Sequence, residues 1–115
     1  MPHVIRAGSA DLAAAWRGLS EGPWRWGGAV ARLEGGFLGR DERSLLLAAV
    51  VVEYGRPIHV LVLISVRDDE TAVRLWPPLP VERTEAVKRL IAHLASELTA
   101  FGAGEVRTTN LVLPT

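Results

Sequence analysis

Two tryptophans flank an arginine within the glycine-rich stretch of residues 22–43, in the order Trp24, Arg25, Trp26. Tryptophan and arginine are enriched in interface hot spots and ligand pockets, where they combine a large contact surface with hydrogen-bond donors. A tryptophan beside a helix can equally fill the core between that helix and a sheet. We therefore take Trp24, Arg25 and Trp26 as candidate residues for binding a substrate or partner, with core packing as the alternative.

The histidines and acids of the chain do not form a metal-binding or catalytic pattern. His3, His59 and His93 are far apart in the sequence, and the chain contains no cysteine. Thiolate ligands, disulfides and cysteine nucleophiles are therefore excluded, and no zinc-binding histidine spacing exists. The acidic run at residues 68–70 fits a solvated turn better than a calcium loop, which needs more ligands at defined intervals. We expect no metal site and assign no catalytic residue.

The composition is that of one globular domain spanning residues 1–115. The chain is 49% hydrophobic and 23% charged, and its length allows a single domain. Thirteen basic and thirteen acidic side chains give a net charge of +0, which argues against nucleic-acid binding through phosphates. The longest apolar runs, about nine residues, are far shorter than the roughly 20 that span a bilayer. We expect a cytoplasmic protein without nucleic-acid or membrane partners.

Three apolar segments predict a β-meander. Residues 45–54 and 58–66 are nearly continuous apolar runs rich in β-branched residues, and residues 71–76 form a shorter third run. Turn sequences separate the three runs. We therefore expect three successive antiparallel strands. Because these strands are apolar on both sides, we also expect a sheet that is covered on both faces.

Two helices are expected, one before and one after the meander. Apolar residues at helical spacing predict a helix over residues 10–20, with Ser9 as its N-cap. The same spacing marks a longer helix over residues 87–101. At its start, Glu85 and Arg89 have the i, i+4 spacing of an ion pair.

The remaining segments complete the predicted order of elements. Residues 22–43 contain six of the eleven glycines and are expected to form a loop with a short helix. Within them, Ala29–Glu34 could form one or two helical turns or part of a strand. Residues 105–113 are predicted to be a last strand. A strand–helix–strand crossover is right-handed and would make this last strand parallel to residues 71–76.

This order of elements resembles the GNAT-type acyl-CoA N-acyltransferase superfamily. The segments Val4–Arg6 and Asp11–Leu12 are similar to the family's opening strand and helix, Leu75–Pro77 to the end of its fourth strand, and Gly104–Pro114 to its fifth strand. The resemblance implies an α+β fold, a mixed, mostly antiparallel five-stranded GNAT-like sheet with helices on both faces. The family's following helix and last two strands would lie beyond residue 115.

The same resemblance implies where acyl-CoA would bind, and this sequence departs from the family there. The family's pyrophosphate loop is rich in glycine, whereas residues 81–88 contain none, and Glu82 and Glu85 oppose a bound anion. If acyl-CoA were bound, Trp76, Arg83 and Thr84 would contact it. We expect no cofactor, with acetyl-CoA as the ligand only if the domain is an active enzyme.

Three functions follow as hypotheses. The first is a GNAT-like domain without acetyltransferase activity that acts as a binding or pairing module, as a homodimer or with a second GNAT-like domain. The alternatives are a noncanonical N-acetyltransferase acting on a small amine and an unrelated small dimeric α+β protein. In each, the last strand is an edge that can recruit another strand, and Val112 would lie in that contact.

Overall fold

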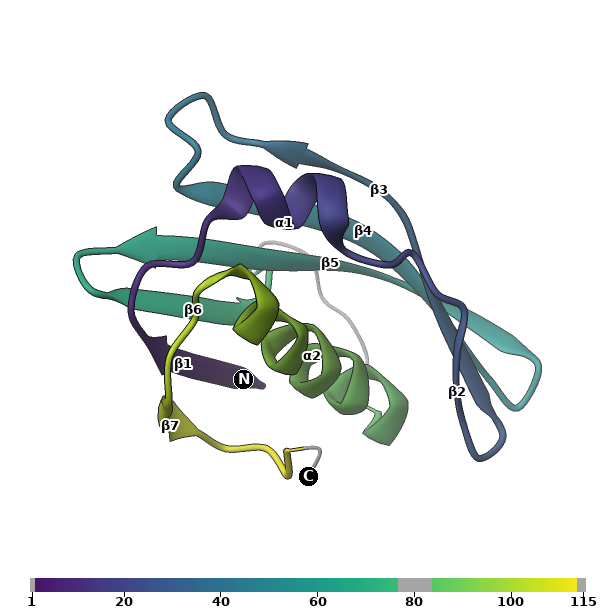
Figure 1. Cartoon of the computed structure of the whole chain (residues 1–115). Coiled ribbons are helices and arrows are strands. Elements are labelled where there is room, and N and C mark those ends of the chain that lie inside the picture. Colours follow the sequence, from purple (N-terminus) through teal and green to yellow (C-terminus); the bar gives the residue numbers. More distant parts are fainter. Residues whose placement is uncertain (1, 77–83, 114–115) are drawn as a thin grey trace.

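The computed structural model describes residues 2–76 and 84–113. The described chain forms one seven-stranded sheet, two α-helices and a 3-10 helix (Figure 1). In chain order the elements are β1 (His3–Ala7), α1 (Leu12–Gly18), β2 (Trp24–Trp26), β3 (Ala29–Leu38), β4 (Ser44–Glu53), β5 (Arg56–Arg67), β6 (Glu70–Leu75), α2 (Glu85–Glu97), η1 (Leu98–Phe101) and β7 (Val106–Thr109). The strands lie in the order β2-β3-β4-β5-β6-β1-β7, and every neighbouring pair is antiparallel.

The predicted meander is confirmed. Strands β4, β5 and β6 are consecutive neighbours, and β4 and β5 pair along their length from Ser44 opposite Ser65 to Glu53 opposite Arg56. The turn between β4 and β5 consists of Tyr54 and Gly55, which both have positive φ angles. Two such residues in succession form the tight turn that the right-handed twist of paired strands favours.

The expected five-stranded GNAT-like sheet with helices on both faces is wrong. The sheet has seven strands, it is antiparallel throughout and curled, and both helices lie on its concave side (Figure 1). Helix α1 contacts β3, β4 and η1, while α2 contacts β1, β3, β4 and β6. The outward positions of the central strands are apolar, but neither helix lies over them. The prediction that helices cover both faces of the sheet was therefore wrong.

Residues 22–43 form strands β2 and β3 instead of a loop with a short helix. The inward positions of β3 are the buried residues Ala29, Ala31 and Leu33, and the last two lie opposite the core residues Val51 and Ala49 of β4. The register shifts between Leu33 and Gly35, as in a β-bulge. The glycines interrupt the apolar alternation that would have predicted the strand, while the long β4 edge supplies the hydrogen bonds that hold it.

The predicted parallel pairing of the last strand with residues 71–76 is also wrong. Strand β1 lies between β6 and β7 and is antiparallel to both. The last strand covers only Val106–Thr109, less than the 105–113 that the apolar run predicted. The N-terminal strand had been assigned no partner, so its insertion at this place in the sheet could not be foreseen.

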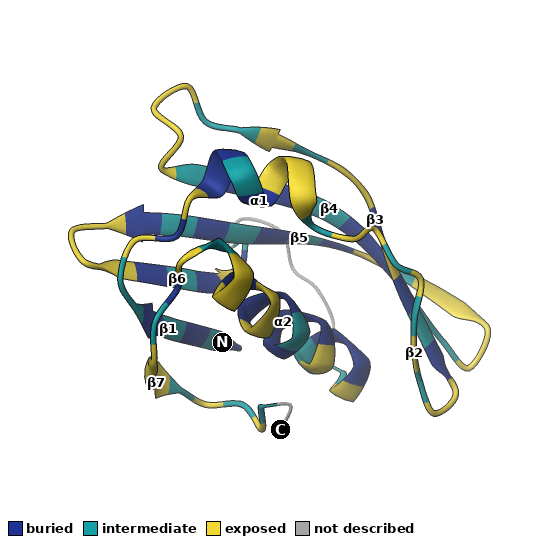
Figure 2. Cartoon of the chain, in the orientation of Figure 1, coloured by how far each residue is buried: buried dark blue, intermediate teal, exposed yellow. Residues whose placement is uncertain are grey.

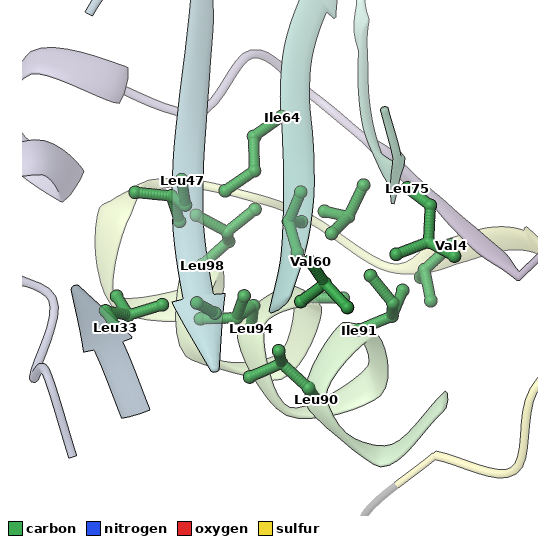
Figure 3. Close-up of a cluster of buried hydrophobic side chains, with 14 of the residues drawn as sticks. Val4, Leu33, Leu47, Val60, Ile64, Leu75, Leu90, Ile91, Leu94 and Leu98 are labelled. Carbon is green, nitrogen blue, oxygen red and sulfur yellow. The ribbon is translucent and has the colours of Figure 1, made fainter. Parts of the chain in front are cut away.

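The core lies between the concave side of the sheet and the helices (Figure 2). The face predicted for the long helix is confirmed, because Val87, Leu90, Ile91, Leu94 and Leu98 are all buried. Figure 3 shows the centre of this core, where leucines and isoleucine from α2 and η1 meet side chains from the strands: Val4, Leu33, Leu47, Val60, Ile64 and Leu75. No helix in the described part of the chain is long and apolar enough to cross a membrane.

The helix ends are capped by polar side chains. Asp11, and not Ser9, caps α1, because its Oδ1 accepts a hydrogen bond from Ala14 N at 3.0 Å. Thr84 caps α2 in the same way through Val87 N at 3.3 Å. Gly102 ends η1 in the left-handed conformation that glycine favours.

Arg6 ties strand β1 to the C-terminal end of the helical segment. Its guanidinium is buried and donates three hydrogen bonds to carbonyl oxygens: Nε to Gly104 at 2.7 Å, Nη1 to Ala95 at 2.7 Å and Nη2 to Ala103 at 3.3 Å. A helix C-terminus carries partial negative charge, so a cation is favoured there. Desolvation by burial lowers the pKa of Arg6.

Candidate functional site

The outer face of the sheet is apolar over its central strands. Outward positions alternate with core positions along β4 and β5, and at the centre of both strands the outward positions are also occupied by aliphatic residues. We call the centre of this face the outer strip, which consists of Phe37, Leu46, Ala48, Leu61 and Leu63. Phe37 is 75% exposed, and the other four residues are partly buried.

The strand register brings the members of the outer strip together. Phe37 of β3 lies opposite Leu46 of β4, which in turn lies opposite Leu63 of β5. Ala48 and Leu61 form the next cross-strand pair on the same face. Directly opposed side chains on one face of a sheet are close enough to touch. The five residues therefore form a continuous apolar surface instead of isolated exposed side chains.

A group of charged and polar side chains borders the outer strip. Glu34, at the irregular register of β3, lies 3.9 Å from the guanidinium of Arg32 and 3.4 Å from Nδ1 of His59. Arg32 and His59 both lie opposite Val50 on β4, which is only 7% exposed. The border of the strip thus carries both signs of charge side by side.

No described element covers the outer strip. Both helices lie on the opposite side of the sheet (Figure 1). An antiparallel sheet with one solvated face normally alternates apolar and polar residues along its strands, and this alternation is absent at the centre of β4 and β5. A contiguous exposed apolar surface of this kind is typical of an interaction site.

The predicted tryptophans lie on the concave side, where β2 meets α2. The rings of Trp24 and Trp26 are stacked with centroids 6.4 Å apart, and both contact His93, at 4.6 Å and 5.7 Å. Trp24 and Trp26 pair with the inward positions Ala31 and Ala29 of β3. The aromatic cluster therefore packs the β2–β3 hairpin against the helix, so the core-packing alternative describes Trp24 and Trp26 in part.

His93 is the titratable member of this aromatic cluster. Desolvation by burial lowers its pKa from the ordinary value of 6.5, and the nearby carboxylate of Glu97 acts in the opposite direction. Its Nε2 lies 3.3 Å from Glu97 Oε1, but it is shielded from solvent and makes no hydrogen bond. Among the described residues, the rings of Trp24 and Trp26 and the carboxylate of Glu97 contact His93, and none of these is a nucleophile that it could activate.

The structure does not gather the other predicted site residues at one place. Arg25 is exposed and pairs with Val30 on the outer side of the sheet, away from the two tryptophans. Trp76 follows β6, where its backbone N–H donates to the carbonyl of Leu61 at 2.8 Å. Thr84 is the N-cap of α2, and Arg83 lies outside the described residues.

Val112 is 95% exposed and follows β7, which is the last strand at that edge of the sheet. The edge predicted from the sequence therefore exists, although the strand ends at Thr109 and Val112 lies beyond it. At the turn between β5 and β6, Arg107 pairs with Asp69 at 3.4 Å and with Glu70 at 3.1 Å. Among the residues that the structure describes, no group of three or more histidines, cysteines or acids could hold a metal ion.

Sequence reasoning missed the outer strip although its signal was present. The apolar residues on both sides of the segments at 45–54 and 58–66 pointed to two buried faces, but not to the absence of a covering helix. Comparisons with protein-family models, with curated proteins and with solved structures found no match.

Proposed function

We propose that the chain is a pairing module that associates with a second copy of itself through the outer strip. The observation that supports this proposal is the combination of apolar outward residues on β4 and β5 with two helices on one side of the sheet. Burial of apolar surface is worth about 25 cal/mol per Å². Leu46, Leu61 and Leu63 gain this stabilisation only when another molecule covers them.

The charges around the strip favour a copy of this chain as the occupant. Arg32 and Glu34 lie 3.9 Å apart at its border, so the surface carries both signs and can complement itself across a two-fold axis. The chain has a net charge of +0, so two copies do not repel each other over a long range.

The dimensions of the molecule are sufficient for such a contact. The molecule measures 39 × 27 × 26 Å. A face that includes the longest axis is therefore large enough to bury the roughly 800 Å² per partner that a stable interface needs. Face-to-face packing of sheets at about 10 Å places the outward side chains of both sheets in one apolar layer.

Two matched variants test which surface mediates the pairing. Leu46→Glu places a carboxylate between Phe37 and Leu63, where pairing would bury it without a cross-strand counter-ion, so we expect association at least about 100-fold weaker. Val112→Lys adds a charge beyond β7 and should leave the mass unchanged. Light scattering after size exclusion gives the mass of each protein, and far-ultraviolet circular dichroism checks that it is folded.

The variants also separate this proposal from pairing through the β7 edge. A folded Leu46→Glu protein with the mass of one chain, beside a Val112→Lys protein with the mass of two, supports the outer strip. A Val112→Lys protein that is monomeric while Leu46→Glu remains dimeric would refute the outer strip in favour of the sheet edge. Wild-type protein that is monomeric at high micromolar concentration would refute self-pairing altogether.

A further inference from the structure

A groove runs along α2 on the concave side of the sheet, away from the outer strip. It consists of two hollows of about 280 and 270 Å³ that share Trp26 and Arg89 as walls. We call the two together the hairpin groove. Its first hollow lies between α2 and the hairpin turns, and Glu53, Tyr54, Glu85 and Gly27 contribute to its lining. The second lies beside His93, and Ala92, Val112 and Leu113 complete it.

The first hollow is lined by two carboxylates, Glu53 and Glu85, and by the guanidinium of Arg89. Glu53 has a carboxylate oxygen, Oε2, that is shielded from solvent and accepts no hydrogen bond. Arg89 makes no ion pair with a described residue, because Glu85 pairs with Lys88 at 3.5 Å instead of forming the predicted pair with Arg89. A shielded polar atom without a partner is destabilising, so each such atom calls for an explanation.

The second hollow is mostly apolar, and the guanidinium of Arg89 at its junction with the first hollow is the one permanently charged group among its lining residues. Trp26, Ala92 and Leu113 give it a hydrophobic lining, and burial lowers the pKa of His93, which favours the neutral imidazole at neutral pH. The centroid of the Trp26 ring lies 5.7 Å from that of His93, so one wall of the hollow is aromatic. Away from Arg89, this lining suits an aliphatic or aromatic group.

We propose that the hairpin groove binds a zwitterionic ligand with an apolar body, the chemistry of a free aromatic or large aliphatic α-amino acid. The ligand's ammonium group donates to Glu53, and its carboxylate accepts from Arg89. Its side chain lies against Trp26 in the second hollow. A ligand with only one of the two charges would displace water from both Glu53 and Arg89 but would pair with only one of them. The groove therefore discriminates against a ligand that carries a single charge.

Three small molecules that differ only in charge test this inference. L-phenylalanine carries both charged groups, 2-phenylethylamine lacks the carboxylate, and 3-phenylpropionate lacks the ammonium group. We expect a dissociation constant on the order of 0.1–1 mM for L-phenylalanine and at least about 10-fold weaker binding for the other two. Isothermal titration measures the affinities, and the indole N–H signal of Trp26 in NMR spectra locates the bound ligand.

Two charge-removing variants identify the groups that recognise the ligand. Glu53→Gln should weaken L-phenylalanine and 2-phenylethylamine but not 3-phenylpropionate, and Arg89→Gln should weaken L-phenylalanine and 3-phenylpropionate but not the amine. Glu105→Gln, an exposed substitution outside the groove, is the matched control. Unchanged amide spectra away from the groove show that a variant is folded.

Several results would overturn the inference. They are the absence of binding at about 10 mM L-phenylalanine, equal affinity for all three molecules, and variants that bind as the wild type does. The outer strip lies on the other side of the sheet, so the groove variants should also leave the mass in solution unchanged.

Discussion

At the scale of single residues, Arg6 is a buried cation whose partners are all backbone carbonyls. Replacing it by methionine would leave the carbonyls of Ala95, Ala103 and Gly104 without their donor. We expect Arg6→Met to lower the free energy of unfolding by about 2–4 kcal/mol, as a lost buried hydrogen-bond network does. Urea denaturation measures the loss.

Two further variants show whether the loss comes from the hydrogen bonds of Arg6. Arg6→Lys should recover only part of the stability, because an ammonium group lacks the planar fork that reaches three acceptors. Arg40→Met, at an exposed loop position, should change stability by less than about 0.5 kcal/mol. Equal stability of Arg6→Met and Arg40→Met would contradict the role assigned to Arg6.

His93 makes stability depend on pH. Burial lowers its pKa in the folded protein below the ordinary 6.5, so below that pH the unfolded chain binds more protons than the folded one. The free energy of unfolding therefore falls as the pH decreases from about 6.5 towards the folded pKa, and levels off below it.

Replacing His93 by glutamine tests this pH dependence. The difference in unfolding free energy between wild type and His93→Gln should be constant above about pH 7.5 and should move against the wild type as the pH falls towards 5. Subtracting the two profiles, each from urea denaturation, cancels the contributions of the other groups. Parallel profiles over this range would show that the folded protein does not disfavour the protonated imidazole.

At the scale of elements, two adjacent glycines in β3 provide a matched test of how α1 packs on the sheet. A Cβ atom at Gly36 would lie 2.5 Å from the carbonyl oxygen of Leu46 and 2.9 Å from the ring of Trp16, whereas one at Gly35 would meet nothing within 4 Å. We expect Gly36→Ala to cost about 1–3 kcal/mol. Gly35→Ala should be neutral or slightly stabilising, because it removes freedom from the unfolded chain.

Thermal unfolding of the two glycine variants distinguishes these outcomes. A shift of about 4–8 °C per kcal/mol is typical for a domain of this size. If the two variants unfold at the same temperature, β3 does not approach β4 and α1 as closely at Gly36 as described.

The elements that could be predicted from the sequence are those with uninterrupted patterns. The meander of β4, β5 and β6 and the buried face of α2 follow from apolar periodicity, which local sequence determines. Strand β3 could not be predicted in this way because Gly35 and Gly36 interrupt its alternation, and β2 has only three residues. Both are held by pairing with a neighbour, which is a property of the sheet and not of the segment.

At the scale of the whole molecule, the position of β1 determines how the sheet differs from the expected one. Because β1 lies between β6 and β7, the last strand does not pair with β6 as the crossover suggested. The position of a strand in the sheet depends on the packing of the whole core, so the periodicity of the strand's own residues does not predict it. The outer strip was not assigned from the sequence. Trp26, a candidate binding residue from the sequence, lines the hairpin groove, and its binding role stays a prediction.

The most direct test of pairing measures solvent access to the methyl groups of the outer strip in the unmodified protein. A soluble paramagnetic agent broadens the NMR signals of methyl groups that it can approach. At millimolar protein concentration, the proposal predicts protected methyl signals for Leu46, Leu61 and Leu63 and strong broadening for Val112, with the protection lost on dilution. Leucine methyl signals that broaden fully at all concentrations, or protection that appears only at Val112, would contradict pairing through the outer strip.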